Sequence, residues 1–380
     1  MITESSWMND ELRMFRASAR RFIEKEFVPQ QDCWRKQQRP DAESWTKAGE
    51  VGLLLSDIPA EYGGGGGTFA YEAIVVEELA RAGVHFASFI QSSVAHYILD
   101  YGLEPQKRYW LPRMAAGELV GAIAITEPGA GSDVKGIRTT AHRFGDHYLI
   151  NGSKTFVTNG WHAGLVCLAV KTDPNAVGLK GISVIAVETK DLRGYRVGRS
   201  LDKVGMHGQD TCELFFDDVR VPASNLLGSA EGRGFSQLME KMNYERLAIA
   251  VAALATAERA VALTTKYVND RMAFGNALID FQNTRFKLAE CKTEARIGRV
   301  FLDRCIEDFI AGRLDDATAA MAKYWLSECE CRIVDECVQL HGGYGYMTEF
   351  PIARMWADSR VHRLYAGANE ILKELIATSL

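Results

Sequence analysis

The chain has 380 residues, of which 47% are apolar and 24% charged, so its composition is that of a folded globular protein. Its length exceeds the needs of one small core and predicts two or three domains. The formal net charge of −5 and the pI near 6.0 argue against general binding to nucleic acid or to an anionic membrane.

The first part of the chain, residues 1–120, is predicted to be an N-terminal α-helical domain. Apolar side chains recur there at helical spacing, as at Leu12, Phe15 and Ala19. Five consecutive glycines, residues 63–67, interrupt the pattern. No Lys-Ser or Lys-Thr follows them, so we interpret them as a flexible connector between helices rather than a phosphate loop.

The pattern changes twice beyond residue 120. Residues 121–230 contain short β-rich segments separated by glycine, proline and asparagine, which predict a compact middle β domain. Residues 231–380 return to long amphipathic helices, with stops near Gly275, Gly312 and the Gly342-Gly343 pair, and are predicted to form a helical bundle. The expected fold class is therefore α+β, in the order helices, strands, helices.

The N-terminal segment carries acids and lacks an apolar core followed by a small-residue cleavage site. We therefore expect a cytoplasmic protein without an integral membrane segment. The eight cysteines show no framework spacing and are expected to stay reduced. Cys329, Cys331 and Cys337 are interpreted as buried small side chains rather than ligands, and no metal is expected.

Two glycine-rich runs carry the strongest functional signal. The first, AITEPGAGSDVKG, spans residues 124–136, and the second, QLHGGYGYMTEFPIARMWAD, spans residues 339–358. Glycines let backbone amides approach a ligand, while acids, hydroxyls and arginines follow at fixed offsets. Together the runs resemble the two signature stretches of the acyl-CoA dehydrogenase family. The resemblance extends from about residue 9 to the end of the chain.

That resemblance implies the family's architecture: an N-terminal helical domain, a middle β-barrel and a C-terminal four-helix bundle. The resemblance also implies FAD, held between the barrel and the bundle. No predicted strand ends in the GxGxxG fingerprint of a dinucleotide fold, so a Rossmann fingerprint is not expected to hold this FAD. An acyl-CoA substrate, an electron-transferring flavoprotein as acceptor and a homotetramer follow from the same resemblance.

The family's cofactor and substrate contacts map onto specific positions of this chain. In the first run and the following KTFVTNG segment, the resemblance assigns flavin contacts to Ile125, Thr126, Phe156 and Thr158, and a substrate contact to Ser132. A neighbouring subunit's FAD is expected to contact Arg271, Phe274, Gln282, Gln339, Gly342 and Gly343. Asn369 is a further expected cofactor contact. An arginine such as Arg271 can form charge-assisted bonds to a pyrophosphate.

Removing a proton next to a thioester carbonyl requires a positioned carboxylate. Many relatives carry it in a YEG motif near the end of the chain, but this chain has Tyr365-Ala366-Gly367, and alanine cannot be a base. The backbone amide of Ala366, with Gly367 beside it, is still expected to serve the thioester oxygen.

A smaller set of relatives, the long-chain and isovaleryl-type dehydrogenases, places the base on a helix just before an arginine, and this chain has Glu245-Arg246 there. Glu245 falls within an apolar stripe, where burial raises a carboxylate's pKa toward neutrality. Arg246 is expected to reach or position the substrate. The alternative is a rim glutamate paired with Lys241 at i−4.

The expected function is FAD-dependent α,β-dehydrogenation of an acyl-CoA to the trans-2-enoyl-CoA. Two alternatives stay open. One is another flavin reaction on the same scaffold, such as an acyl-CoA oxidase, a desulfinase or a nitroalkane oxidase, and the other is a flavin-free structural module. The acyl group is also open, since straight long, methyl-branched and terpenoid-derived chains all fit the pattern.

Overall fold

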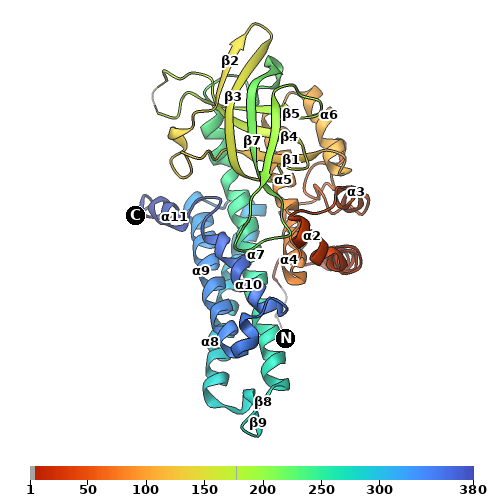
Figure 1. Ribbon diagram of the computed structural model, residues 1–380, viewed down its shortest axis with the longest axis vertical. Helices are drawn as coiled ribbons and strands as arrows, with labels where there is room; N and C mark the ends of the chain where they lie inside the picture. The colour runs from red at the N-terminus through yellow and green to blue at the C-terminus, as the bar shows by residue number, and fades with distance from the viewer. Residues whose placement is uncertain (1–4, 177) are drawn as a thin grey trace.

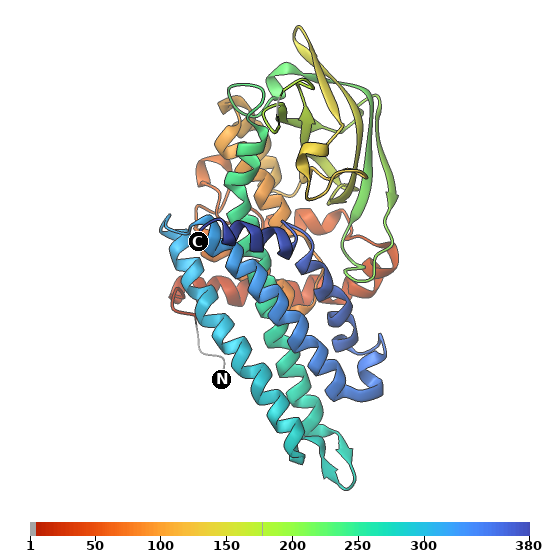
Figure 2. The same cartoon turned by 90° about the vertical axis from the view of Figure 1, so that its left-hand side faces the viewer.

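The computed structural model describes residues 5–176 and 178–380, which form three consecutive parts (Figure 1). Helices come first, a sheet follows, and long helices complete the chain, as predicted. The long helix α7 (Gly234–Asp270) runs from beside the sheet to the far end of the molecule and joins all three parts (Figures 1 and 2).

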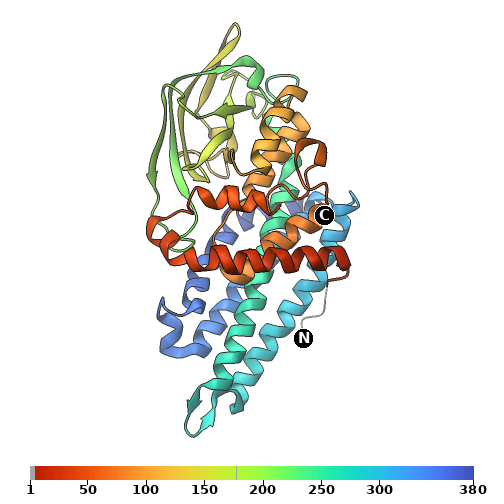
Figure 3. The same cartoon turned by 90° about the vertical axis from the view of Figure 1, so that its right-hand side faces the viewer.

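From residue 5 onward, the N-terminal part contains six α-helices: α1 (Asp10–Phe22), α2 (Gln31–Gln37), α3 (Glu43–Glu50), α4 (Phe69–Ala82), α5 (Ser88–Tyr101) and α6 (Glu104–Ala115). A short π-helix (Ile23–Phe27) continues α1. Local capping sets some of their limits. The Asn9 side chain accepts the Leu12 amide at the start of α1, and Gly83, at φ 71°, ends α4. In Figure 3, α1 lies in front of α4, on which it packs.

The glycine run before α4 is an ordered connector rather than a flexible one. The amides of Gly65 and Gly67 donate to the carbonyls of Leu55 and Ser56, both at 3.0 Å. A Cβ at Gly64 would lie 2.2 Å from the carbonyl oxygen of Ile58, so the backbones approach too closely for any side chain there.

The middle part is one seven-stranded sheet in the order β1-β4-β2-β3-β7-β6, with β5 on β4. Its strands are β1 (Val120–Ala124), β2 (Thr140–Phe144), β3 (His147–Thr158), β4 (Ala163–Lys171), β5 (Ile182–Glu188), β6 (Tyr195–Ser200) and β7 (Thr211–Pro222). The strands wrap around a core that includes Tyr148, Val166 and Leu214. Among the described residues, β1 and β6 are not hydrogen-bonded to each other, so the expected barrel is a sheet without hydrogen-bonded closure.

The C-terminal part contains three long helices, α7, α8 (Gln282–Ile310) and α9 (Asp316–His341), followed by α10 (Pro351–Ser359) and α11 (Asn369–Ala377). A small hairpin of β8 (Met272–Ala273) and β9 (Asn276–Ala277) joins α7 to α8. The short α10 packs on α9 and α7 and takes the place of a fourth helix (Figure 2). Gly312 and Gly342, at φ 66° and 58°, follow the ends of α8 and α9, where the sequence predicted stops.

Helix α7 is long and apolar enough to cross a membrane by length and composition, which the sequence analysis did not anticipate. In the fold, 72% of its apolar 18-residue window is buried, as in the core helix of a globular protein. All eight cysteines are free thiols. Within the described ranges, no group of three His, Cys, Asp or Glu side chains is arranged to hold a metal ion.

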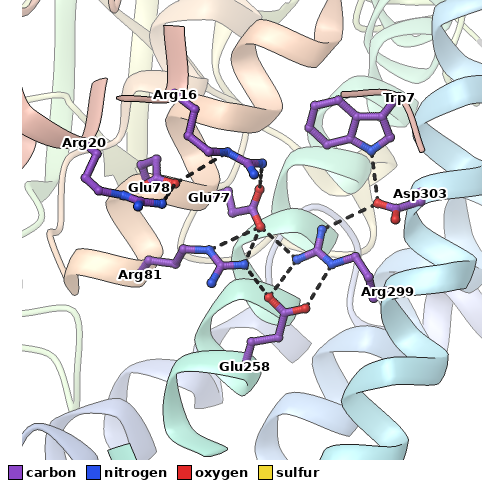
Figure 4. Close-up of polar contacts among 9 residues, drawn as sticks. All are labelled: Trp7, Arg16, Arg20, Glu77, Glu78, Arg81, Glu258, Arg299 and Asp303. Atoms are coloured by element: carbon purple, nitrogen blue, oxygen red, sulfur yellow. Dashed lines mark hydrogen bonds and ion pairs between the residues drawn. The ribbon is translucent and has the colours of Figure 1, made fainter. Parts of the chain in front are cut away.

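A buried ionic cluster fastens the N-terminal helices to the C-terminal ones (Figure 4). Glu77 on α4 accepts hydrogen bonds from Arg16 on α1 (2.7 Å), Arg81 (2.7 Å) and Arg299 on α8 (2.9 Å). Arg299 also donates to Glu258 on α7 at 3.0 Å. Although burial opposes ionisation, the three arginines hold the pKa of Glu77 at about 2, so the cluster stays charged across the working pH range.

Candidate active site

Glu245 is a buried carboxylate on α7, in the stripe that the sequence predicted. The residue is 7% exposed, and Leu238, Met242 and Ile249 on the same helix face are also buried. Burial raises the Glu245 pKa to about 7, while Arg246 opposes the shift. Its Oε1 atom has no hydrogen-bond partner among the described residues. A buried oxygen without a partner, on a group that titrates near neutrality, is available to take a proton.

The alternative of a rim glutamate paired with Lys241 is wrong. The Lys241 ammonium forms its ion pair with Asp100 at the end of α5. Arg246 is buried as well, and its nearest hydrogen-bond acceptor is the Asn243 side chain, at 3.5 Å from Nη1. Its Nε atom has no partner within the described part of the chain. Neither cation therefore neutralises Glu245 through a direct ion pair.

The structure joins the first glycine-rich run to the KTFVTNG segment through Lys154, which the sequence analysis did not single out. The buried Lys154 ammonium donates to the Ile125 carbonyl (2.9 Å) and to Glu127 (2.7 Å). In return, the Thr155 amide donates to the Thr126 carbonyl at 2.9 Å. Ile125, Thr126, Phe156 and Thr158 thus lie on two adjoining segments with fixed spacing. Ser132 lies farther along the first run, on its exposed side.

Three of the expected site residues have strained backbones. Phe156, Phe274 and Ala366 lie at φ 58°, 51° and 49°, where an L-residue with a side chain is disfavoured. The two phenylalanines are also 66% and 94% exposed. Large aromatic side chains held outward on strained backbone suit contact with a flat ring system, so the residues fit the expected flavin and its adenine end.

The turn before α11 is fastened to α9 by a second lysine that the sequence analysis missed. Lys323 is fully buried, and its ammonium donates to the Gly367 carbonyl (2.8 Å) and the Asn369 Oδ1 atom (3.0 Å). Burial, together with the nearby Arg246 charge, lowers the Lys323 pKa to about 7. Lys323 therefore places Ala366 and Gly367 in the same neighbourhood as the Glu245-Arg246 turn.

Asn369, an expected cofactor contact, is buried and hydrogen-bonded to other residues of the protein. It is 1% exposed, and its amide nitrogen donates to Ser327 and Glu328 on α9, both at 3.0 Å. Its side-chain oxygen already accepts from Lys323. The structure thus shows Asn369 holding the turn in place, and its contact with the cofactor stays a prediction.

A small cavity of about 90 Å³ lies farther along α7 from Glu245, and none of the expected site residues lines it. Ala252 and Thr256 of α7 line it below Glu245, and Ala252 lies seven residues along the helix, on nearly the same face. Tyr365, next to Ala366, and Gln209, whose amide nitrogen is 3.5 Å from the Thr158 hydroxyl, line the other sides. The cavity thus borders α7, the loop between β6 and β7 and the residue before Ala366, and it extends to Gly83, Arg259 and Asp358.

A second group of expected residues gathers at the far end of the helical part. Arg271, Gln339, Gly342 and Gly343 line one open cleft of about 490 Å³. A Cβ at either glycine would face open space, so the backbone there is free to contact a ligand. Arg271 lies over the Tyr344 ring at 5.5 Å. Guanidinium, bare backbone and aromatic ring together suit the diphosphate and adenosine parts of FAD.

Phe274 and Gln282 belong to the same end of the molecule but do not line that cleft. Phe274 extends from the β8–β9 hairpin, and Gln282 is the exposed first residue of α8. His341, within the second glycine-rich run, donates a hydrogen bond from Nδ1 to the Cys337 carbonyl at 2.8 Å and stacks on Tyr267.

The two groups of site residues are far apart within one chain. Glu245 and Arg271 are separated by 26 positions of one continuous helix, which is about 39 Å at the usual rise per residue. That length exceeds the reach of one FAD molecule. The distal cleft therefore cannot complete the site beside Glu245 of the same subunit.

Family models match the chain in three consecutive stretches. Residues 9–118 match the acyl-CoA dehydrogenase N-terminal domain, residues 122–219 its middle domain and residues 232–380 its C-terminal domain. The chain is 44% identical over 375 residues to the mitochondrial long-chain specific acyl-CoA dehydrogenase of Sus scrofa, covering 98% of this chain and 87% of that protein.

Solved structures give the same result. An acyl-CoA dehydrogenase from Geobacillus kaustophilus has a TM-score of 0.97 and 47% identity, with 99% of each chain covered. A glutaryl-CoA dehydrogenase from Mycobacterium smegmatis in complex with FADH2 has a TM-score of 0.91 and 28% identity, over 98% of this chain and 95% of that one. The protein therefore belongs to the acyl-CoA dehydrogenase family of FAD-dependent oxidoreductases.

Proposed function

We propose that Glu245 is the base that removes the α-proton of an acyl-CoA thioester. The observation that carries this assignment is the Glu245 carboxylate itself, buried, with Oε1 unpartnered and a pKa near 7. A base with a pKa near the working pH is both ionised and basic enough to act. FAD, when bound, accepts the β-hydrogen as hydride, so the product is the trans-2-enoyl-CoA.

The turn at Ala366 supplies the second requirement of this chemistry. Negative charge develops on the thioester oxygen as the α-proton leaves, and a fixed backbone N–H stabilises it. The Ala366 amide needs no side chain for this role. Lys323 holds the adjoining Gly367 carbonyl, so the amide is oriented before substrate arrives. Arg246, buried beside Glu245, positions the substrate.

We propose a long-chain acyl group as the preferred substrate class, supported by the 44% identity to a long-chain specific relative. The test is anaerobic mixing of the purified, flavin-loaded protein with short, long and branched acyl-CoAs while the visible flavin absorbance is followed. Rapid bleaching by long straight chains supports both the reaction and the substrate class. Bleaching only by short or branched acyl groups would reject the substrate class, and no bleaching by any of them would reject the reaction.

We further propose that an electron-transferring flavoprotein reoxidises the flavin and that the protein is a homotetramer in which paired subunits complete each other's FAD sites. The separation of about 39 Å between Glu245 and Arg271 supports sharing between subunits, because each FAD then needs a second chain. Turnover in air without an added acceptor would instead favour an oxidase.

A further inference from the structure

A third cleft, of about 250 Å³, lies where the N-terminal and C-terminal helices meet. It is lined by residues of α2, the end of α4, α7 and α10: Gln31, Asp32, Arg35, Gly83, Arg259 and Arg354 among them. None of the residues assigned above to substrate or cofactor lines it, and it shares no lining residue with the distal cleft around Arg271. It adjoins the cavity of about 90 Å³ and shares with it Gly83, Arg259, Met355 and Asp358.

Three guanidinium groups face this cleft, and one of them has no partner. Across residues 5–176 and 178–380, Arg259 makes no hydrogen bond or ion pair, although it is largely covered. Burial lowers the Arg259 pKa to about 10, and the charges of Arg354 and Arg35 act in the same direction, while the Asp358 carboxylate opposes them. Arg354 donates a hydrogen bond from Nη1 to the Thr348 carbonyl (2.7 Å), and its other guanidinium N–H groups are available to a ligand in the cleft.

The carboxylates at the cleft offset this charge only in part, since Asp358 raises the pKa of Arg259 and Asp32 and Asp358 raise that of Arg354 without pairing with either guanidinium. Asp358 accepts hydrogen bonds from His85 at 2.9 Å and from the Met206 amide, so both of its carboxylate oxygens already have partners. Asp32 is exposed at the rim and contacts Arg35 at 3.3 Å. Neither forms an ion pair with Arg259. A mostly buried cation without a direct ion-pair partner is costly, and an external anion would lower that cost.

The backbone around Arg259 also fits a built site. A Cβ at Gly83 would lie 2.2 Å from the Arg259 Nη1 atom, so glycine at the end of α4 lets the guanidinium pack against bare backbone. Pro351, the first residue of the nine-residue helix α10, lines the same cleft. The positive end of α10 therefore adds to the three arginines, while the C-terminal end of α4, at Ala82 and Gly83, lines the cleft with the opposite partial charge.

We propose that this cleft binds a dianionic phosphate group, held by Arg259 and Arg354 with Arg35 at the rim. Guanidinium forks match phosphate oxygens in pairs, and the volume of the cleft admits a phosphate ester as well as the free ion. Inorganic phosphate and a phosphorylated small molecule share this chemistry. The experiment below separates them.

The test is binding of sodium phosphate, sodium pyrophosphate and ADP to the flavin-loaded protein by calorimetry, in buffers held at constant ionic strength with sodium chloride. The proposal expects saturable binding that is weakened at least tenfold in Arg259→Met and in Arg354→Met. Tighter binding of ADP or pyrophosphate than of phosphate would identify a phosphorylated molecule as the ligand, and the reverse order would identify the free ion. Arg304→Met, on the exposed face of α8, is the matched control and should bind like the parent.

Flavin content and melting temperature in chloride show whether each variant is folded. If Arg259→Met fails to fold, the half-buried Arg354→Met decides. Absence of saturable binding in the parent, or equal binding in the parent and the folded arginine variants, would overturn the proposal. Release of flavin on phosphate addition would also overturn it, because the anion would then be competing at the cofactor site.

Discussion

Lys241, one helical turn before Glu245 on α7, forms its ion pair with Asp100 on α5. The cation that could have paired with Glu245 at i−4 is therefore bound elsewhere. Burial is left as the dominant influence on the Glu245 carboxyl, and its pKa rises to about 7. The role proposed for Glu245 as a base depends on the absence of a Lys241–Glu245 ion pair.

The pH dependence of catalysis should follow the Glu245 carboxyl. Only its ionised form accepts a proton, so kcat/KM should be level above pH 7 and fall about tenfold per pH unit well below it. Steady-state assays with one acyl-CoA from pH 5.5 to 8.5 would measure this. A profile that stays flat down to pH 5.5 would show that the base titrates much lower than proposed.

The Glu245 carboxyl should also make the stability of the fold depend on pH, and stability should fall over the pH range in which activity rises. Because its folded pKa of about 7 exceeds the usual value of 4.5, the folded state keeps a proton that the unfolded state releases between these values. Its contribution is full below pH 4.5, is lost as pH rises toward 7, and is constant above. At pH 8 the free energy of unfolding of Glu245→Gln should therefore exceed that of the parent by on the order of 2–3 kcal/mol, and at pH 5 the two free energies should be nearly equal. Urea denaturation of both proteins at both pH values would measure these free energies. A difference between variant and parent that is the same at pH 5 and pH 8 would count against a buried, titrating carboxyl.

Sharing of the FAD site between subunits predicts complementation. Glu245→Gln removes the base from its own site, while Arg271→Met damages the site of the neighbouring subunit. In a mixed assembly, the Arg271→Met chain keeps its Glu245 and receives an intact Arg271, so one site in each pair is complete. Co-expression of two differently tagged variants should restore up to about half of the activity per pair. If both residues served one site of the same chain, the mixture would be as inactive as the separate variants.

The cluster around Glu77 predicts a large loss of stability on a small change. Glu77→Gln leaves Arg16, Arg81 and Arg299 without their shared counter-charge and should cost about 3–5 kcal/mol in denaturant unfolding. Asp308→Asn, which interrupts the more exposed pairs with Arg304 and Arg313, is the control and should cost less than about 1 kcal/mol. Equal costs for the two variants would show that the cluster does not join the two helical parts.

Local patterns were sufficient to predict the order of helices, strands and helices and the burial of Glu245. Helical periodicity reports which face of α7 is apolar, and a carboxylate on that face must be buried with it. The glycines after α8 and α9 could also be predicted as helix ends, because the positive φ that ends a helix is set by the local backbone and favours glycine.

Contacts between distant segments could not be predicted in this way. Lys154 and Lys323 appear in the sequence as ordinary charged residues, yet each is buried and holds a turn through a backbone carbonyl. The Arg299–Glu77 pair spans 222 positions and depends on how two helical parts dock. The cofactor contact of Asn369 stays a prediction, and the hydrogen bonds that its buried amide makes to α9 depend on how α11 docks there.

The most direct test is anaerobic mixing of flavin-loaded Glu245→Gln with the acyl-CoA that bleaches the parent most rapidly. The account predicts that FAD stays bound and that flavin reduction slows by at least about 100-fold, the lower range for a positioned base. Adding Ala366→Glu to the same variant, which places a carboxylate on the opposite approach to the substrate, tests for partial recovery. Flavin reduction by Glu245→Gln alone within a few-fold of the parent rate would contradict the assignment of Glu245 as the base.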